Sequence, residues 1–165
     1  MKLMLVRSLM IAAVIALAGC DHAAKHAAKS ELEGRPPHAV MGNVVRLDYV
    51  ENRDTGFGLL RWLEPETRLP IIVALQSLGA LALSIALLRR RSFDLYAAAF
   101  ALVLAGALGN LLDRVIRGYV VDFIRVPHWP VFNLADVWIT IGVGLLALAY
   151  TGVLPRRRAE AEAKS

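Results

Sequence analysis

Three carboxylates lie close together in a largely apolar part of the chain. Asp113, Asp122 and Asp136 fall within 24 residues, beside long apolar stretches. A carboxylate that loses water has a raised pKa unless a cation or a hydrogen bond compensates it, so each of these residues needs an explanation. Asp122 interrupts the apolar run 119–124, where a solvated face is not expected. It is therefore the strongest candidate for a functional group.

Asp122 and Asp136 are fourteen residues apart, so one helix face cannot bring them together. They can meet only if a loop or a short strand returns Asp122 against the first turn of a helix that begins near residue 134. Two facing carboxylates share a proton, because adjacent like charges cannot both ionise. One can then act as general base on a water molecule and the other as general acid, as in aspartic proteases.

Structural roles are also available to the polar residues near these acids. Asn110, Asp113 and Arg114 have the i, i+3, i+4 spacing of one helical face, so they can pair and close the helix end. Asn133 can cap the next helix, with Asp136 as its N3 acid, in the manner of a capping box. No serine lies in a Gly-x-Ser-x-Gly context and the four histidines lack zinc-site spacing, so we expect no metal and no cofactor.

Long apolar segments must position these side chains. Hydrophobic residues make up 57% of the 165 residues and the mean hydropathy is +0.52, more than a small soluble core can absorb. Segments of about 18 to 20 residues can cross a hydrocarbon core of about 30 Å as helices. We predict one membrane-embedded domain over residues 1–165, an all-α membrane protein with four transmembrane helices. The predicted spans are about 3–22, 70–88, 93–112 and 134–154.

The net charge of +5 is concentrated in basic clusters between the spans. Lys2 and Arg7, the arginines at 89–91 and those at 156–158 lie on one side if all four segments span. The positive-inside rule makes that side cytoplasmic, with both termini inside. We expect no nucleic-acid binding, because no basic stripe is interleaved with aromatic residues.

The segment 23–69 is then periplasmic. Residues 44–49 alternate in character and are followed by a turn-rich stretch and by a second short run at 57–62. This pattern predicts a small antiparallel sheet or hairpin, a platform outside the membrane, joined to the first span by a linker at 34–37. The tail at about 156–165 is rich in Ala, Glu and Lys, and we expect it to be disordered.

The first apolar segment has two interpretations. A short apolar run at 9–17 follows Lys2 and Arg7 and leads to Leu-Ala-Gly-Cys at 17–20, which resembles the lipobox of a bacterial lipoprotein signal. Alternatively, Arg7 can extend to the membrane surface and the segment can be a retained helix. The first interpretation makes the chain a lipoprotein anchored at Cys20.

Three motifs resemble those of the lipoprotein signal peptidase family, also called signal peptidase II. They are Gly-Asn-Leu-Leu-Asp-Arg at 109–114, Val-Val-Asp-Phe at 120–123 and Phe-Asn-Leu-Ala-Asp at 132–136. The aspartyl dyad of the family is matched by Asp122 and Asp136. The family also carries Asp-x-x-x-Lys at the outer end of its first helix, matched by Asp21 and Lys25, which favours a retained first helix.

A further family motif, Asn-Thr-Gly-Ala-Ala-Phe, is only partly present. Residues 52–57 read Asn-Arg-Asp-Thr-Gly-Phe, so Asn52 and Phe57 fit whereas the small residues between them do not.

The resemblance implies an aspartic endopeptidase of the bacterial inner membrane that cleaves diacylglyceryl-modified prolipoproteins just before the lipidated cysteine. On this interpretation Asn110, Arg114 and Asn133 orient the dyad and the scissile carbonyl, while Asp113 pairs with Arg114. Asp21, Lys25 and Asn52 are further supporting residues. The expected partners are prolipoproteins and membrane lipid, and we expect a monomer. The alternatives are a non-catalytic lipoprotein or small transporter, and a family member that binds precursors without cutting them.

Overall fold

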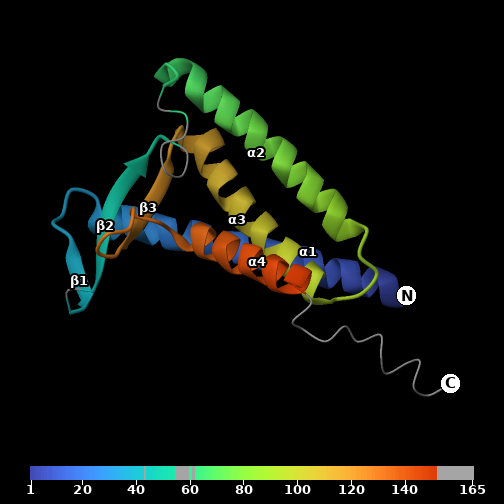
Figure 1. Cartoon of the computed structure of the whole chain (residues 1–165). Helices are drawn as coiled ribbons and strands as arrows, with labels where there is room; N and C mark the ends of the chain where they lie inside the picture. Colours follow the sequence, from blue (N-terminus) through green and yellow to red (C-terminus); the bar gives the residue numbers. More distant parts are fainter. Residues whose placement is uncertain (43, 55–59, 61, 152–165) are drawn as a thin grey trace.

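The computed structural model describes residues 1–42, 44–54, 60 and 62–151, which form four long helices and a small sheet (Figure 1). The helices are α1 (Lys2–Leu32), α2 (Pro65–Leu88), α3 (Leu95–Arg117) and α4 (Leu134–Thr151), and the strands are β1 (His38–Met41), β2 (Val45–Asn52) and β3 (Val120–Arg125). All four helices are long and apolar enough to cross a membrane. The predicted class, four membrane helices with a small sheet, is confirmed.

Local signals define the helix ends. Pro65 occupies the first turn of α2, where its missing N–H is not needed. The Asp94 carboxylate accepts a hydrogen bond from the Ala97 N–H at 2.9 Å and caps α3. Gly118 ends α3 in the left-handed region, with φ of 78°.

Three helices extend beyond the predicted spans. α1 continues past residue 22 to Leu32, because residues 23–32 are rich in good helix formers such as alanine, lysine and glutamate. α2 begins at Pro65 rather than near residue 70, and α3 continues past residue 112 to Arg117. α4 is described as far as Thr151, and the last predicted residues of its span and the tail at 156–165 lie outside the described residues.

The sheet is antiparallel, in the order β1-β2-β3. The sequence correctly predicted a strand near 44–49, and the β2 strand found there pairs with β1 and with β3. Most of the second predicted strand, at 57–62, lies outside the described residues. β3 comes from the connection between α3 and α4, so its pairing with β2 is non-local and local alternation could not indicate it. The pairing places Asp122 opposite Val50.

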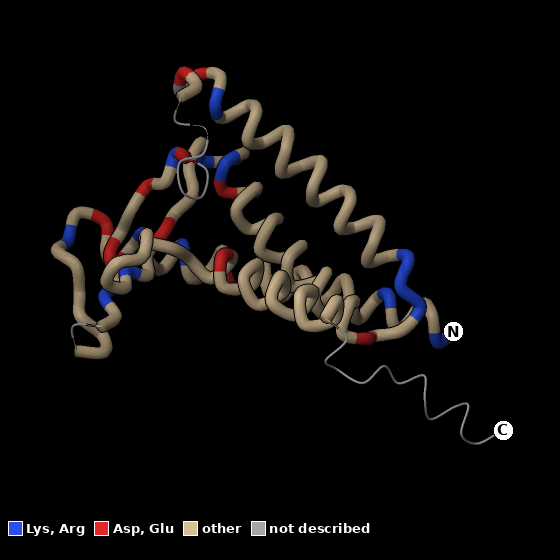
Figure 2. Tube along the Cα trace, in the orientation of Figure 1, with Lys and Arg blue, Asp and Glu red and all other residues tan. Residues whose placement is uncertain are grey.

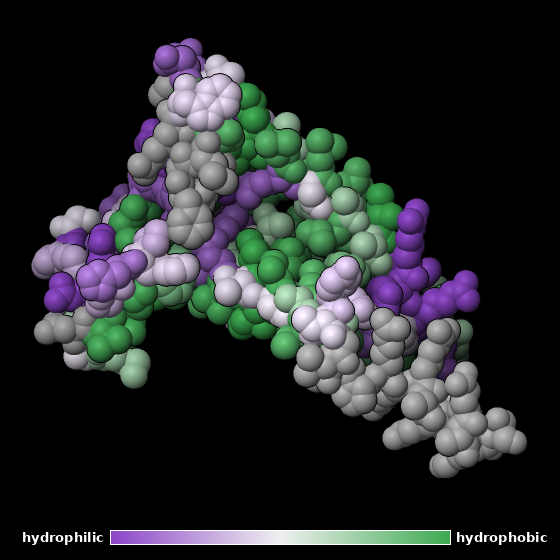
Figure 3. All heavy atoms as spheres, in the orientation of Figure 1, coloured by the Kyte–Doolittle hydropathy of each residue, from purple (hydrophilic) through white to green (hydrophobic). Residues whose placement is uncertain are grey.

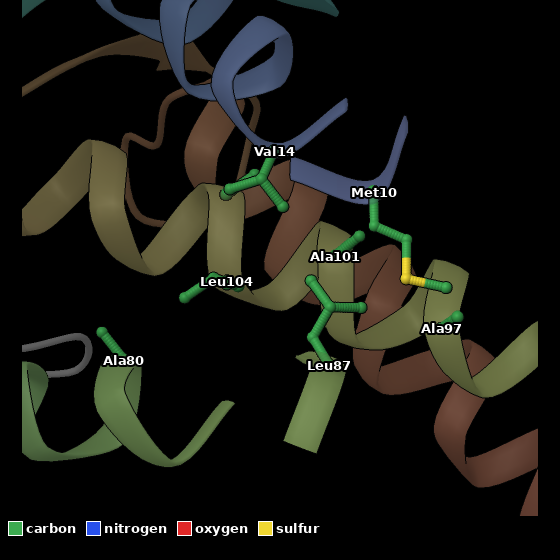
Figure 4. Packing of buried hydrophobic residues seen from close by; sticks show 8 residues of the cluster. Met10, Val14, Ala80, Leu87, Ala97, Ala101 and Leu104 are labelled. Carbon is green, nitrogen blue, oxygen red and sulfur yellow. The ribbon is translucent and has the colours of Figure 1, made fainter. Parts of the chain in front are cut away.

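α3 is the central helix, packing against α4, α1 and α2. Figure 4 shows where side chains of α1, α2 and α3 meet: Met10, Val14, Ala80, Leu87, Ala97, Ala101 and Leu104. Small residues on α3 allow the neighbouring backbones to approach closely, as is typical of helices packed in membranes.

Charged residues lie mainly at the two ends of the helical bundle. Figure 2 shows basic residues where α1 begins and α2 ends, and mixed charges around the sheet at the opposite end, which we call the sheet end. The surface between them is largely hydrophobic (Figure 3), and α2 exposes Leu75, Leu78 and Leu81 on it. Apolar side chains directed outward along a helix are expected where lipid rather than water is the solvent.

The contact between α3 and α4 provides a test of this packing. A Cβ atom at Gly142 would lie 2.6 Å from Cγ2 of Val103 and 2.9 Å from the carbonyl oxygen of Ala99. We expect Gly142→Ala to lower the free energy of unfolding by about 1–3 kcal/mol through overpacking. Gly144→Ala, on the same helix with no atom within 4 Å of its Cβ, is the matched control and should not destabilise the protein. Equal melting temperatures of the two variants in detergent would contradict this packing.

Candidate active site

Asp122 and Asp136 are linked through one side chain, that of Asn133. Its amide nitrogen donates to Oδ1 of Asp122 at 2.6 Å, and its amide oxygen accepts from the backbone N–H of Asp136 at 3.1 Å. The Asp136 carboxylate in turn accepts from the Asn133 N–H at 3.2 Å. The predicted capping box at the start of α4 is therefore present, and it holds an aspartate of β3 as well as one of α4.

The environment of Asp122 favours its protonated form. Burial, together with the nearby charge of Asp136, raises the pKa of Asp122 to about 6, even though the hydrogen bonds from Asn52 and Asn133 act in the opposite direction. The amide of Asn52 donates to Oδ2 of Asp122 at 2.8 Å. Asp122 can therefore retain a proton to higher pH than an ordinary aspartate does.

Asn110 connects this pair to a buried cation. Its amide nitrogen donates to Oδ1 of Asp136 at 2.9 Å, and its amide oxygen accepts from Nζ of Lys25 at 2.8 Å and from the amide of Asn133 at 3.1 Å. Both ends of the Asn110 amide are thus engaged, which fixes its orientation and that of the Asp136 carboxylate.

Lys25 is fully buried between two aspartates. Its Nζ lies 2.7 Å from Asp21 and 3.1 Å from Asp113, and both acids are also fully buried. Asp21 accepts the backbone N–H of Ala135 at 2.8 Å, and Asp113 accepts that of Val121 at 3.1 Å. The ion cluster therefore binds α1 and α3 to the backbone of the residues next to Asp136 and Asp122.

One predicted pairing is wrong. Asp113 pairs with Lys25 and with Arg117, one turn further along α3, rather than with Arg114. The guanidinium of Arg114 donates instead to the side chain of Gln76 at 3.1 Å and to the carbonyl oxygen of Asp54 at 2.9 Å. The helix-face argument chose the wrong partner because Lys25 of α1 and Arg117 of α3 bind Asp113, while Gln76 of α2 and Asp54 bind Arg114.

Two glycines of α3 allow these close approaches. A Cβ atom at Gly109 would lie 2.6 Å from Oδ2 of Asp21, and one at Gly106 would overlap the carbonyl oxygen of Ala135. Any larger residue would push α1 or α4 away from α3 and with it the hydrogen-bonded acids.

All nine residues predicted for the site belong to one connected network of hydrogen bonds and ion pairs: Asp21, Lys25, Asn52, Asn110, Asp113, Arg114, Asp122, Asn133 and Asp136. The sequence did not point to Asp54 or Arg68. Gln76 could have been found from the sequence, because a glutamine inside an apolar span needs a polar partner.

Other features lie outside this network. Cys20 is exposed on α1, within a continuous helix. A hollow of about 390 Å³ is lined by Arg46, Arg125, Val126, Pro127, His128 and Trp129 and includes neither Asp122 nor Asp136. Among the residues that the structure describes, no group of three His, Cys, Asp or Glu side chains is arranged to hold a metal.

The fold and the site define a class: a membrane protein with two linked aspartates at one end of its helical bundle, which resembles the paired carboxyl groups of aspartic peptidases. Comparisons with known proteins agree. The family model described as Signal peptidase (SPase) II matches residues 12–151. The chain belongs to the signal peptidase II family of membrane proteases.

Individual relatives and solved structures are similar along most of the chain. A lipoprotein signal peptidase of Caldicellulosiruptor bescii is 44% identical over 110 residues, 67% of this chain and 69% of that protein. One of Dichelobacter nodosus is 36% identical over 140 residues, 78% of this chain and 84% of that protein. A solved structure of a bacterial membrane enzyme has a TM-score of 0.76 and 24% identity, covering 91% of this chain and 93% of that one, which shows the same fold.

The buried cation provides a test of the network. Lys25→Met removes a fully buried ammonium and leaves two carboxylates without it. Because breaking a buried ion pair leaves uncompensated charge, we expect the free energy of unfolding to fall by about 3–5 kcal/mol. The matched control is Arg35→Met, which removes the exposed i, i+4 pair with Glu31 and should change thermal stability in detergent little. Similar stability of the two variants would contradict the central position of Lys25.

Proposed function

We propose that this chain cleaves the signal peptide of diacylglyceryl-modified prolipoproteins immediately before the lipidated cysteine, using a water molecule activated by Asp122 and Asp136. The observation that supports this most is the direct link between the two acids, in which Asn133 donates to one carboxylate and caps the helix that carries the other. The lipoprotein signal peptidases to which the chain is similar support the choice of substrate.

The proposed reaction requires one proton on the aspartate pair. The ionised carboxylate takes a proton from water as the water oxygen attacks the scissile carbonyl carbon, and the protonated carboxyl group donates its proton to the carbonyl oxygen. The carboxyl group that took the proton from water then donates it to the amide nitrogen, while the other carboxylate takes a proton from one hydroxyl of the tetrahedral diol. The C–N bond breaks, which gives a carboxylic acid and a free amine and leaves one proton on the pair. Burial of Asp122 favours the singly protonated state of the pair that this reaction needs.

The arrangement of charge supports an orientation. We place the basic end of the bundle, with the arginines at 89–91, in the cytoplasm of a bacterial inner membrane, and the sheet end in the periplasm. Asp122 and Asp136 then lie at the periplasmic boundary, where water is available from outside and a membrane-anchored substrate can approach from the side. The protein would act as a monomer, since both acids come from one chain.

The first prediction of this proposal concerns the two acids. We expect Asp122→Asn and Asp136→Asn each to lower the rate of cleavage of a lipidated precursor peptide by at least about 10²-fold, because each removes one acid–base group. Both variants should remain folded in detergent. The control is Asp48→Asn, which removes the ion pair of Asp48 with Arg125 on the same sheet and should retain activity. Normal cleavage by either dyad variant would overturn the proposed function.

The second prediction concerns pH. Asn52 donates a hydrogen bond to Asp122, which stabilises the ionised carboxylate and so lowers its pKa. Asn52→Ala should raise that pKa, so the singly protonated pair should persist to higher pH. We expect the alkaline limb of the kcat/KM profile to move upward by about one pH unit. A limb that stays in place or moves to lower pH would show that this hydrogen bond does not tune the pair.

A further inference from the structure

The chain departs from the motif of the family at residues 53–56, and Asp54, one of these residues, has a contact that a glycine at this position could not make. The Asp54 carboxylate lies 2.5 Å from Nη1 of Arg68, in the first turns of α2, and both side chains are largely buried, at 21% and 16% exposed. Nη2 of Arg68 also donates to the carbonyl oxygen of Leu63 at 2.8 Å, which fixes the guanidinium at the start of the helix.

Two backbone hydrogen bonds connect Asp54 to the proposed active site. Its N–H donates to the amide oxygen of Asn52 at 3.0 Å, and its carbonyl oxygen accepts from Arg114 at 2.9 Å. An asparagine amide has one acceptor and one donor end. With the oxygen of Asn52 held by the Asp54 N–H, its nitrogen is directed toward Asp122, to which it donates at 2.8 Å.

We propose that Asp54 and Arg68 are a pair of positioning residues, whose ion pair anchors the chain after β2 to the start of α2 and thereby keeps the Asn52 amide directed at Asp122. This inference rests on the proposed function, because it assigns the pair to the support of a catalytic acid. The route from the ion pair to Asp122 runs along the backbone of Asp54 and through the amide of Asn52.

Few contacts orient the side chain of Asn52. Asn52 is the last residue of β2 and is paired there with Val120. Its amide oxygen is bound by the N–H of Asp54, just beyond the end of the strand. Arg114 adds a second tie through the Asp54 carbonyl, and its guanidinium is itself held by Gln76. Gln76 already connects this cluster to the middle of α2, and the ion pair adds a direct connection from Asp54 to the start of the same helix.

Loss of the pair should affect Asp122 specifically. The charged groups near Asp122 are Asp136 on α4, Lys25 on α1 and Arg114 on α3, and substitution of Asp54 or Arg68 changes none of them. The expected change is a weaker Asn52 hydrogen bond to the ionised carboxylate. It should lower kcat more than it raises KM, and should move the alkaline limb in the same direction as Asn52→Ala but by less.

The experiment uses the full chain in detergent with a lipidated precursor peptide. Asp54→Asn keeps the backbone contacts and loses the charge, and Arg68→Gln removes the partner. We expect each to lower kcat about 3- to 30-fold and to shift the alkaline limb upward, and the Asp54→Asn, Arg68→Gln double variant to be no worse than either alone. Asp48→Asn breaks an ion pair elsewhere on the sheet and should change neither quantity.

Two further variants separate positioning from folding. The charge-reversed pair, Asp54→Arg with Arg68→Asp, should recover part of the lost kcat if it melts near the parent temperature. Independently of that, adding Asp54→Asn to Asn52→Ala should cause no further shift of the alkaline limb, because both act through one hydrogen bond. Additive shifts, an unshifted limb in the single variants, or lowered melting with unchanged kcat would each overturn the inference. Cleavage by Asp122→Asn would instead overturn the proposed function, so the two failures are distinguishable.

Discussion

The ammonium group of Lys25 is the interaction on which the geometry of the site depends. It is fully buried and binds two acids and one amide, and these partners bind in turn to α4 and β3. Asp21 accepts a backbone N–H of α4, Asp113 accepts one of β3, and Asn110 binds the carboxylate of Asp136. A buried ion cluster contributes little net stability compared with apolar packing of the same volume. Its role here is to define position, because β3 and α4, which carry the two acids, are both held through this cation.

α3 takes part in both the apolar packing and the polar network, and it does so with different parts of its length. Toward the basic end it packs through alanines against α1 and α2 (Figure 4), and toward the sheet end it carries Asn110, Asp113 and Arg114. Gly106 and Gly109 lie between these regions and bring α4 and α1 close enough for the Asp21 carboxylate to reach the backbone of Ala135. The polar contacts are short because the backbones are close, so the small residues of the helix interface are as necessary to the site as its charged ones.

Local patterns in the sequence predicted a large part of this arrangement. The length of the apolar segments indicated the four helices, and the spacing of Asn133 and Asp136 indicated a capping box that the structure confirms. The features that could not be predicted depend on contacts between distant segments. The partner strands of β2, the pairing of Asp113 with Lys25 and the ion pair of Asp54 with Arg68 each join residues whose proximity results from tertiary packing. Spacing on one helix indicated a wrong partner for Asp113, because side chains from another helix compete for a buried acid.

Hydrogen bonds join the two ends of the connection between Asp122 and Asp136, so the loop between these ends does not determine how the two acids lie relative to each other. Phe132 accepts the N–H groups of Phe123 and Ile124 at 3.0 and 2.8 Å and donates its own to Ile124 at 3.0 Å, so the chain returns to β3 immediately before Asn133. Residues 126–131 form a loop beyond these hydrogen bonds, and His128 in this loop has a φ of 62°. The relation of Asp122 to Asp136 is then determined by a strand, a helix N-terminus and one asparagine. The proposed function, in which the two carboxyl groups share a proton, requires such support, because the mutual repulsion of two carboxylates would separate them if either were carried by an unrestrained loop.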